Sequence, residues 1–155
     1  MTKEAPDTLF IQFARAPRAG RVKTRMLPAL SPAEACELHR ELMCWTCEQL
    51  LATGNAVELW IDQRSDDQAI KHCLASGVSA LRQQCGADLG ARMHHALSDG
   101  LARHGQVVLV GSDCPGIDGP YLAAAVAQLG HADIVIGPAL DGGYVLLAAN
   151  RIHSG

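Results

Sequence analysis

Aromatic residues are scarce in this sequence, since Phe, Trp and Tyr together make up 4% of its 155 residues. Proteins that stack single-stranded nucleic acid need exposed rings, so the composition argues against that function. The apolar runs are far too short to cross a bilayer, and the N-terminal segment MTKEAPDT lacks the apolar core of a signal peptide. We therefore expect neither nucleic acid nor a membrane as a partner.

A general excess of positive charge is also lacking, because the formal net charge is -3. The six cysteines do not indicate a disulfide framework, since 48% hydrophobic residues in a chain of this length can bury a substantial core without crosslinks. A reducing, cytoplasmic location fits this usage best. Length and composition predict a single domain over residues 1–155.

One short segment concentrates the positive charge. Residues 15–25, RAPRAGRVKTR, hold five of the thirteen Lys and Arg residues and no acid, and they follow an apolar run at 9–14 that predicts a buried strand. A cationic loop after the first strand of an α/β protein is typical of phosphate binding. Gly20 would let the backbone approach an anion, while Lys23 and Arg25 would supply charge-assisted donors. A solvated basic loop is the alternative, because neither GxxxxGK[ST] nor GxGxxG is present.

Apolar runs and helical patterns alternate along the whole chain. The resulting order, βαβαβαβαββ, predicts one three-layer α/β/α sandwich with a mainly parallel sheet. Helices are predicted to begin at Ser31, Asp67, Asp88 and Asp118, and strands are predicted over residues 9–14, 56–62, 79–84, 107–111, 134–137 and 144–147.

Residues 111–116, GSDCPG, follow the most apolar of the predicted strands. This places Asp113 at the carboxyl end of a central strand, where α/β proteins bind their ligands. Carboxylate oxygens suit Mg²⁺ or Mn²⁺, which usually arrives on a phosphorylated substrate. The alternative is that Asp113 caps a turn or the next helix. We favour the ligand because Ser, Asp and Cys are poor strand residues directly after such an apolar run.

Residues 137–144, GPALDGGY, form a second polar segment just beyond a predicted strand. Gly142 and Gly143 would let a ligand approach the backbone closely. A plain hairpin turn has the same Asp-Gly signature. The functional interpretation is favoured because Asp141 adds a second isolated carboxylate to the edge that carries Asp113.

Cys44 and Cys47 have the spacing of a thioredoxin motif, but they fall in the middle of a predicted helix. There they lack the helix-terminus effect that lowers a thiol pKa, so core packing is the better interpretation. Two thiols are also too few for a zinc site unless Cys73 or Cys85 and a histidine come near in space.

Taken in order, the segments FARAPRAGRVKTR, SPAEA, DLGARM, VVLVGSDCPGI and IGPALDGGYVLL resemble the GT-A fold of the nucleotide-diphospho-sugar transferase superfamily, a Rossmann-like α/β fold. More narrowly, the chain resembles a bacterial glycosyltransferase-like family associated with arsenosugar biosynthesis and related to the 2-phospholactate guanylyltransferases. The resemblance implies a GT-A-like nucleotide-binding domain that works with Mg²⁺ or Mn²⁺. Chains of that family usually continue beyond the DGGY strand, so this one is expected to lack their C-terminal elements.

The resemblance also implies roles for individual residues. Asp113 takes the position of the superfamily's metal-binding aspartate, and Asp141 lies near the acceptor or the metal, so these two are the predicted catalytic residues. The predicted nucleotide- and phosphate-binding residues are Arg15, Gly20, Lys23, Arg25, Asp88, Gly90, Arg92, Gly142 and Gly143.

Three functions are compatible with this set of residues. The first is a glycosyltransferase that moves a sugar from a nucleotide sugar to a small-molecule acceptor. The second is a nucleotidyltransferase of guanylyl or cytidylyl type, in which the same loop binds a nucleoside triphosphate and the acceptor carries a phosphate. The third is a nucleotide-binding module without catalytic activity.

Overall fold

The structure is a computed structural model that describes residues 7–18, 29–112, 114, 116–138 and 144–151. The elements follow the predicted order, and each predicted element lies within a few residues of the observed one. In chain order they are β1 (Thr8–Ala14), α1 (Pro32–Leu51), β2 (Ala56–Ile61), α2 (Gln68–Ser76), β3 (Ala80–Gln83), α3 (Leu89–Leu101), β4 (Gln106–Gly111), α4 (Gly119–Gln128), β5 (Ile134–Pro138) and β6 (Tyr144–Ala149).

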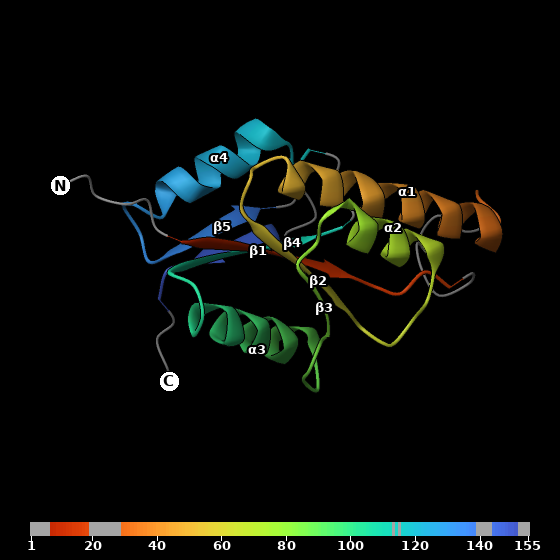
Figure 1. The fold of residues 1–155 in the computed structure, drawn as a ribbon, viewed down its shortest axis with the longest axis horizontal. Coiled ribbons are helices and arrows are strands. Elements are labelled where there is room, and N and C mark those ends of the chain that lie inside the picture. The colour runs from red at the N-terminus through yellow and green to blue at the C-terminus, as the bar shows by residue number, and fades with distance from the viewer. Residues whose placement is uncertain (1–6, 19–28, 113, 115, 139–143, 152–155) are drawn as a thin grey trace.

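The strands form one mixed sheet in the order β3-β2-β1-β4-β6-β5. The first four strands in this order are parallel, whereas β6 is antiparallel to both of its neighbours, β4 and β5. Helices α1, α2 and α4 cover one face of the sheet and α3 covers the other (Figure 1). The predicted three-layer sandwich with a mainly parallel sheet is therefore confirmed.

Strand β1 is buried on both faces, as a central parallel strand should be. Alternate residues of β1 point into two separate apolar layers. The layer under α1, α2 and α4 includes Phe10, Met43, Leu50, Leu59, Ile70, Val108 and Leu122, and the layer over α3 includes Leu9, Ile11, Phe13, Trp60, Met93, Leu97 and Leu109.

All four helices begin at the polar residue expected from the sequence. At α1, Ser31 Oγ accepts a hydrogen bond from the Glu34 amide at 3.1 Å, and Glu34 Oε1 accepts one from the Ser31 amide at 2.9 Å. Side chains of Asp67, Asp88 and Asp118 accept from the first turns of α2, α3 and α4. None of the helices in the described ranges is long and apolar enough to cross a membrane.

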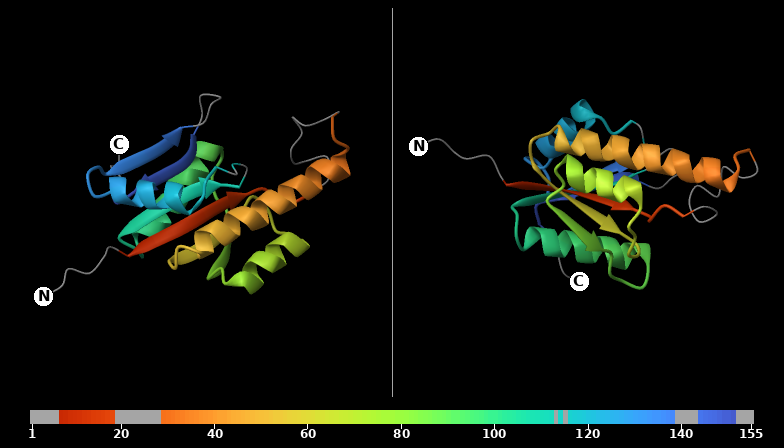
Figure 2. Two further views of the ribbon diagram at one scale, coloured as in Figure 1. Left: turned by 90° about the horizontal axis from the view of Figure 1, so that it is seen from above. Right: turned by 45° about the vertical axis from the view of Figure 1, so that its right-hand side comes forward.

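The chain changes its direction across the sheet at β1. From β1 it moves outward through β2 to β3, and α3 then returns it to β4 on the other side of β1. Strands β1 and β4 are parallel neighbours whose carboxyl ends finish side by side (Figure 2). In open α/β sheets, ligands bind beyond the carboxyl ends of the two strands at which the chain reverses its direction, so a ligand site is expected beyond β1 and β4.

Candidate functional site

The carboxyl ends of β1, β2 and β4 meet at one edge of the sheet because these strands are parallel. The first residues beyond them are Arg15 after β1, Asp62 after β2 and Ser112 after β4. We refer to this part of the molecule as the carboxyl edge. Described parts of two segments that the sequence indicated as functional, residues 15–18 and residues 111 and 112, lie here.

The start of the basic loop is held firmly at the carboxyl edge. The Ala16 amide donates a hydrogen bond to Asp62 Oδ1 at 2.8 Å, and His39 Nε2 on α1 donates one to the Arg15 carbonyl at 2.7 Å. Arg18 Nη1 lies 3.4 Å from Gln63 Oε1, just beyond β2. The backbone after β1 is thus tied to both β2 and α1, while the side chain of Arg15 remains in an exposed position.

Gln84 forms hydrogen bonds with the carboxyl ends of both β1 and β2. Its Nε2 donates to the carbonyls of Trp60 at 2.9 Å and Ala14 at 3.3 Å, and its backbone amide donates to the Ile61 carbonyl at 2.8 Å. Sequence reasoning missed this residue. A polar side chain directly after a short strand was the signal that could have found it.

A second missed contact joins β1 to β4. Gln12 Nε2 donates to Ser112 Oγ and to the Met43 carbonyl of α1, both at 2.9 Å, and Ser112 Oγ donates to the Phe13 carbonyl at 2.9 Å. Gln12 has no exposed surface. The signal in the sequence was an amide inside the otherwise apolar run of residues 9–14.

The predicted nucleotide-side residues at 88–92 open helix α3. Asp88 Oδ1 accepts from the Ala91 amide at 2.8 Å, and Arg92 Nε donates to the Gly86 carbonyl at 3.2 Å. A Cβ on Gly90 would lie 3.5 Å from Asp88 Oδ1. These contacts give Asp88 and Arg92 structural roles at the carboxyl edge, and the predicted contact with a nucleotide stays a prediction.

The structure thus describes four of the predicted site residues: Arg15 beyond β1, and Asp88, Gly90 and Arg92 at the start of α3. It shows no contact between these two groups, although both lie at the carboxyl edge. Gly20, Lys23, Arg25, Asp113, Asp141, Gly142 and Gly143 lie outside the described residues, and their roles stay predictions.

A cavity of about 650 Å³ lies beside the ends of β2 and β3. Its apolar surface comes from Ile61 and Leu81, and its positive side chains are Arg64 and Arg82. No local pattern in the sequence indicated this cavity, because its walls come from segments that are about twenty residues apart in the chain.

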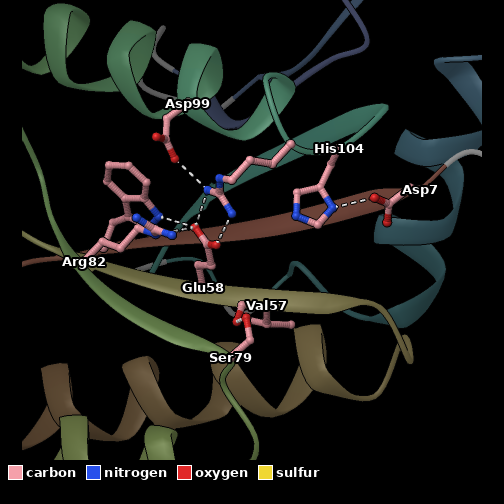
Figure 3. Close-up of polar contacts among 9 residues, drawn as sticks. Asp7, Val57, Glu58, Ser79, Arg82, Asp99 and His104 are labelled. Atoms are coloured by element: carbon pink, nitrogen blue, oxygen red, sulfur yellow. Dashed lines mark hydrogen bonds and ion pairs between the residues drawn. The ribbon is translucent and has the colours of Figure 1, made fainter.

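A cluster of charged side chains among the described residues lies away from this edge, on the face covered by α3 (Figure 3). The carboxylate of Glu58 receives hydrogen bonds from Arg103 at 2.7 and 3.1 Å and from Trp60 Nε1 at 3.0 Å, and Arg82 Nε lies 3.2 Å from it. Burial alone would raise the pKa of Glu58, but the hydrogen bonds from Arg103 and Trp60 and the charges of both arginines lower it. These charges neutralise one another, so we interpret the cluster as structural.

No group of three or more His, Cys, Asp or Glu side chains in the described part of the chain could hold a metal ion. Cys73 does come within hydrogen-bonding reach of the thiols of Cys44 and Cys47, but no histidine joins them. Cys47 and Cys73 lie in the apolar layer under α1 and α2. They are packing residues, as the sequence interpretation expected.

Comparisons with known proteins show the family of this chain and the kind of fold that it has. The sequence profile of a family described as "Uncharacterized protein conserved in bacteria" (DUF2064) matches residues 46–155. A curated relative, the 2-phospho-L-lactate guanylyltransferase of Methanothermobacter thermautotrophicus (strain Delta H), is 25% identical over 130 residues. That match covers 81% of this chain and 55% of the relative, so the chain spans little more than half of its length.

Solved structures resemble the fold over nearly the whole chain. A candidate nucleotide-diphospho-sugar transferase from Desulfovibrio desulfuricans G20 has a TM-score of 0.82 at 29% identity, over 94% of this chain and 64% of that one. A 4-diphosphocytidyl-2C-methyl-D-erythritol synthase from Anaerococcus prevotii DSM 20548 has a TM-score of 0.61 at 11% identity, over 93% and 71%. The fold is that of nucleotide-sugar transferases and nucleotidyltransferases. The comparisons lend no support to a link with arsenosugar biosynthesis.

Proposed function

Because this chain belongs to the DUF2064 family and has the fold of nucleotide-sugar transferases and nucleotidyltransferases, we propose that it is a metal-dependent transferase with a nucleotide-activated donor. We favour a nucleotide sugar as that donor and a small molecule as the acceptor. The chain spans 64% of the Desulfovibrio protein it resembles.

The observation that carries the proposal is the pairing of β1 with β4 at the point where the chain reverses across the sheet. The basic loop follows one of these strands and the GSDCPG segment follows the other. Cationic groups and a carboxylate are therefore expected to face the same crevice, an arrangement suited to a nucleoside diphosphate with its metal ion.

The positive side chains of the basic loop would bind the phosphates of the donor. Arg15 is exposed directly beyond β1, and its backbone is fixed by His39. We propose that Arg15, Lys23 and Arg25 neutralise the charge that develops on the leaving diphosphate. Asp88, Gly90 and Arg92 would lie on the nucleotide side, and Gly142 and Gly143 would let the donor or acceptor approach the backbone.

The two predicted catalytic residues, of which Asp113 is the predicted metal ligand, have suitable chemistry. Asp113 follows β4, and Asp141 falls between β5, which ends at Pro138, and β6, which begins at Tyr144. Strand β6 pairs with β4, so the two acids belong to segments that adjoin neighbouring strands in the chain. Carboxylate oxygens are the ligands that Mg²⁺ and Mn²⁺ prefer. When bound, the cation would stabilise negative charge on the diphosphate as a Lewis acid.

A nucleotidyltransferase is the second candidate, and the guanylyltransferase from Methanothermobacter is the observation that favours it. The two reactions release different products. A glycosyltransferase releases a nucleoside diphosphate from a nucleotide sugar, whereas a nucleotidyltransferase releases pyrophosphate from a nucleoside triphosphate.

The test is a thermal-shift screen of nucleotide sugars and nucleoside triphosphates with Mg²⁺, with Mn²⁺ and with EDTA, followed by product analysis of each binder. A ligand at about 100 times its Kd should stabilise the fold by about 2.7 kcal/mol. Release of nucleoside diphosphate would support the favoured reaction and pyrophosphate the second one. Binding without turnover would indicate the non-catalytic module, and the absence of any shift would contradict the proposal.

Asp113→Asn is the decisive variant for the metal. We expect the loss of one carboxylate ligand to weaken nucleotide binding in Mg²⁺ by at least about tenfold and to leave binding in EDTA unchanged. The matched control is Glu41→Gln, which removes an exposed carboxylate from α1. Wild-type affinity in Asp113→Asn would rule out the metal role of this residue.

A further inference from the structure

The side-chain amide of Gln12 is buried and hydrogen-bonded, and the proposed function assigns it no role. Gln12 is fully buried on β1, and its side chain points into the layer under α1 that also contains Phe10 and Val110. Its Nε2 donates to Ser112 Oγ and to the Met43 carbonyl at 2.9 Å each. Its Oε1 has no hydrogen-bond partner among the described residues.

Stability alone does not explain this amide. A buried polar group loses its hydration, and its hydrogen bonds inside the protein offset most of that loss but add only a modest net stability. An acceptor without a partner adds to the cost. Met, which has the length and flexibility of Gln, would fill the same space with apolar atoms.

The contacts of Gln12 have a specific geometric effect. Val110 is the partner of Gln12 in the β1–β4 pair, and the register ends one residue later, where Phe13 pairs with Gly111. Beyond that point, Ser112 Oγ donates to the Phe13 carbonyl at 2.9 Å while it accepts from Gln12. Side-chain hydrogen bonds thus hold the chain against β1 where the backbone ladder stops.

We propose that Gln12 and Ser112 are positioning residues for the nucleotide–metal site, since they fix the direction in which the chain leaves β4. The residue after Ser112 is the predicted metal ligand. Hydrogen-bonded neighbours that orient a metal ligand contribute strongly to metal affinity even though they do not touch the metal. The nucleotide and the metal ion in this inference rest on the proposed function. The hydrogen bonds of Gln12 and Ser112 are contacts between described residues.

The first test measures how the affinity for UDP and for GDP depends on Mg²⁺ in three variants. We expect Gln12→Met and Ser112→Ala to weaken binding in Mg²⁺ by about tenfold and to leave binding in EDTA unchanged. Ser112→Thr keeps the hydroxyl and should restore most of the affinity. Gln12→Met removes the donor from two buried acceptors, so we also expect a moderate decrease in the melting temperature of the ligand-free variant, and binding in EDTA separates this effect from the effect on the metal site.

Thr46→Val is the matched control. Thr46 is as buried as Gln12, lies on α1, and its Oγ1 has no hydrogen-bond partner in the described ranges. Val has the same shape without the hydroxyl, so the variant removes a buried polar group that does not belong to the Gln12–Ser112 contacts. Its Mg²⁺ dependence should equal that of the wild type.

The second test needs no ligand. Amide hydrogen exchange of peptides that cover residues 107–118 should be faster in Gln12→Met than in the wild type, while peptides from α3 should exchange at wild-type rates. Unchanged exchange in residues 107–118, or an unchanged Mg²⁺ dependence, would overturn the inference. Equal losses with Mg²⁺ and with EDTA would overturn it as well.

Binding experiments on the wild type distinguish a failure of the proposed function from a failure of this inference. If the wild type shows no Mg²⁺-dependent binding of either nucleotide, the proposed function fails, and with it the ligand that Gln12 is inferred to serve. Faster exchange in Gln12→Met would then still support the role of Gln12 in fixing the exit of β4.

Discussion

The backbone amide of Ala16 donates a hydrogen bond of 2.8 Å to Oδ1 of Asp62, and this contact joins the loop after β1 to the end of β2. Ala16 is almost fully buried, with 2% of its surface exposed. Its amide therefore depends on Asp62 as a partner. Asp62, which lies 46 positions further along the chain, thus fixes the point where the basic loop leaves the sheet.

We expect Asp62→Ala to destabilise the protein by about 1–3 kcal/mol, because the Ala16 amide would be left buried without an acceptor. Nucleotide affinity should also fall several-fold if the basic loop binds phosphates. Asp62→Asn keeps an acceptor oxygen and should retain most of both properties. Chemical denaturation and nucleotide titration measure the two effects. Asp66→Ala, in an exposed position on the same loop, is the control, and an equal loss there would contradict the role of Asp62.

The Glu58 cluster predicts a dependence of stability on pH. The pKa of Glu58 is lower in the folded protein than the ordinary value of 4.5, so its ionised form stabilises the fold. This contribution is present above the unfolded-state pKa and is lost as pH falls through the folded-state pKa. Glu58→Gln should therefore flatten the loss of stability below about pH 4.5.

At neutral pH, Glu58→Gln should lower the free energy of unfolding by about 1–3 kcal/mol. The loss should be smaller than for a fully buried ion pair, because the Arg103 side chain is 34% exposed and still pairs with Asp99 at 2.6 Å. Urea denaturation at a series of pH values measures both effects. An equally steep acid dependence in Glu58→Gln would show that other carboxylates dominate.

Gly86 should tolerate no side chain. Its φ is +147°, and a Cβ there would lie 2.8 Å from the Arg92 backbone nitrogen and 2.9 Å from the Ala91 carbonyl carbon. We expect Gly86→Ala to destabilise the fold by about 3 kcal/mol through strain and overpacking at the start of α3. In Gly54→Ala the φ is also positive, at +81°, but no atom lies within 4 Å of the new Cβ. That variant should cost only about 1 kcal/mol, and equal losses would contradict the steric explanation.

The cysteines should differ strongly in their reaction with iodoacetamide. Burial raises the pKa of the Cys36 thiol, and the hydrogen bond with Cys47 together with burial raises that of Cys73. Mass spectrometry of the native protein should find Cys85 modified first, because it alone among the six is exposed. Cys36, Cys47 and Cys73 should react only after unfolding. Equal rates for Cys73 and Cys85 in the native protein would contradict the described packing.

The sequence was informative wherever a local rule was sufficient. Ser31 with Glu34, and the aspartates at the starts of the other three helices, are local capping signals, and all four helices begin where these signals predicted. The apolar run of β1 indicated a buried strand and that of β4 a central one, and both are confirmed, although β4 is parallel to β1 and antiparallel to β6. The α/β sandwich followed from the alternation of these elements.

Less of the candidate site than of the fold could be predicted from the sequence. Gln12 and Gln84 were not recognised, since their partners lie up to 100 residues away along the chain. The residues at 88–92 were assigned to a nucleotide, whereas their described contacts build the start of α3. A local pattern does not distinguish a residue that binds a ligand from one that caps a helix, because both use the same polar groups.

Composition, periodicity and capping residues were thus enough to define the elements, their order and the fold class, because each of these depends on neighbours within about one turn or one strand. The arrangement of the carboxyl edge depends on contacts between distant segments, such as Gln12 with Ser112 and Ala16 with Asp62. Those contacts follow from the strand order, in which β4 lies beside β1 although three helices and two strands separate them in the chain. The strand order is a property of the packed sheet, because the same elements could be connected in other orders with equal local propensities.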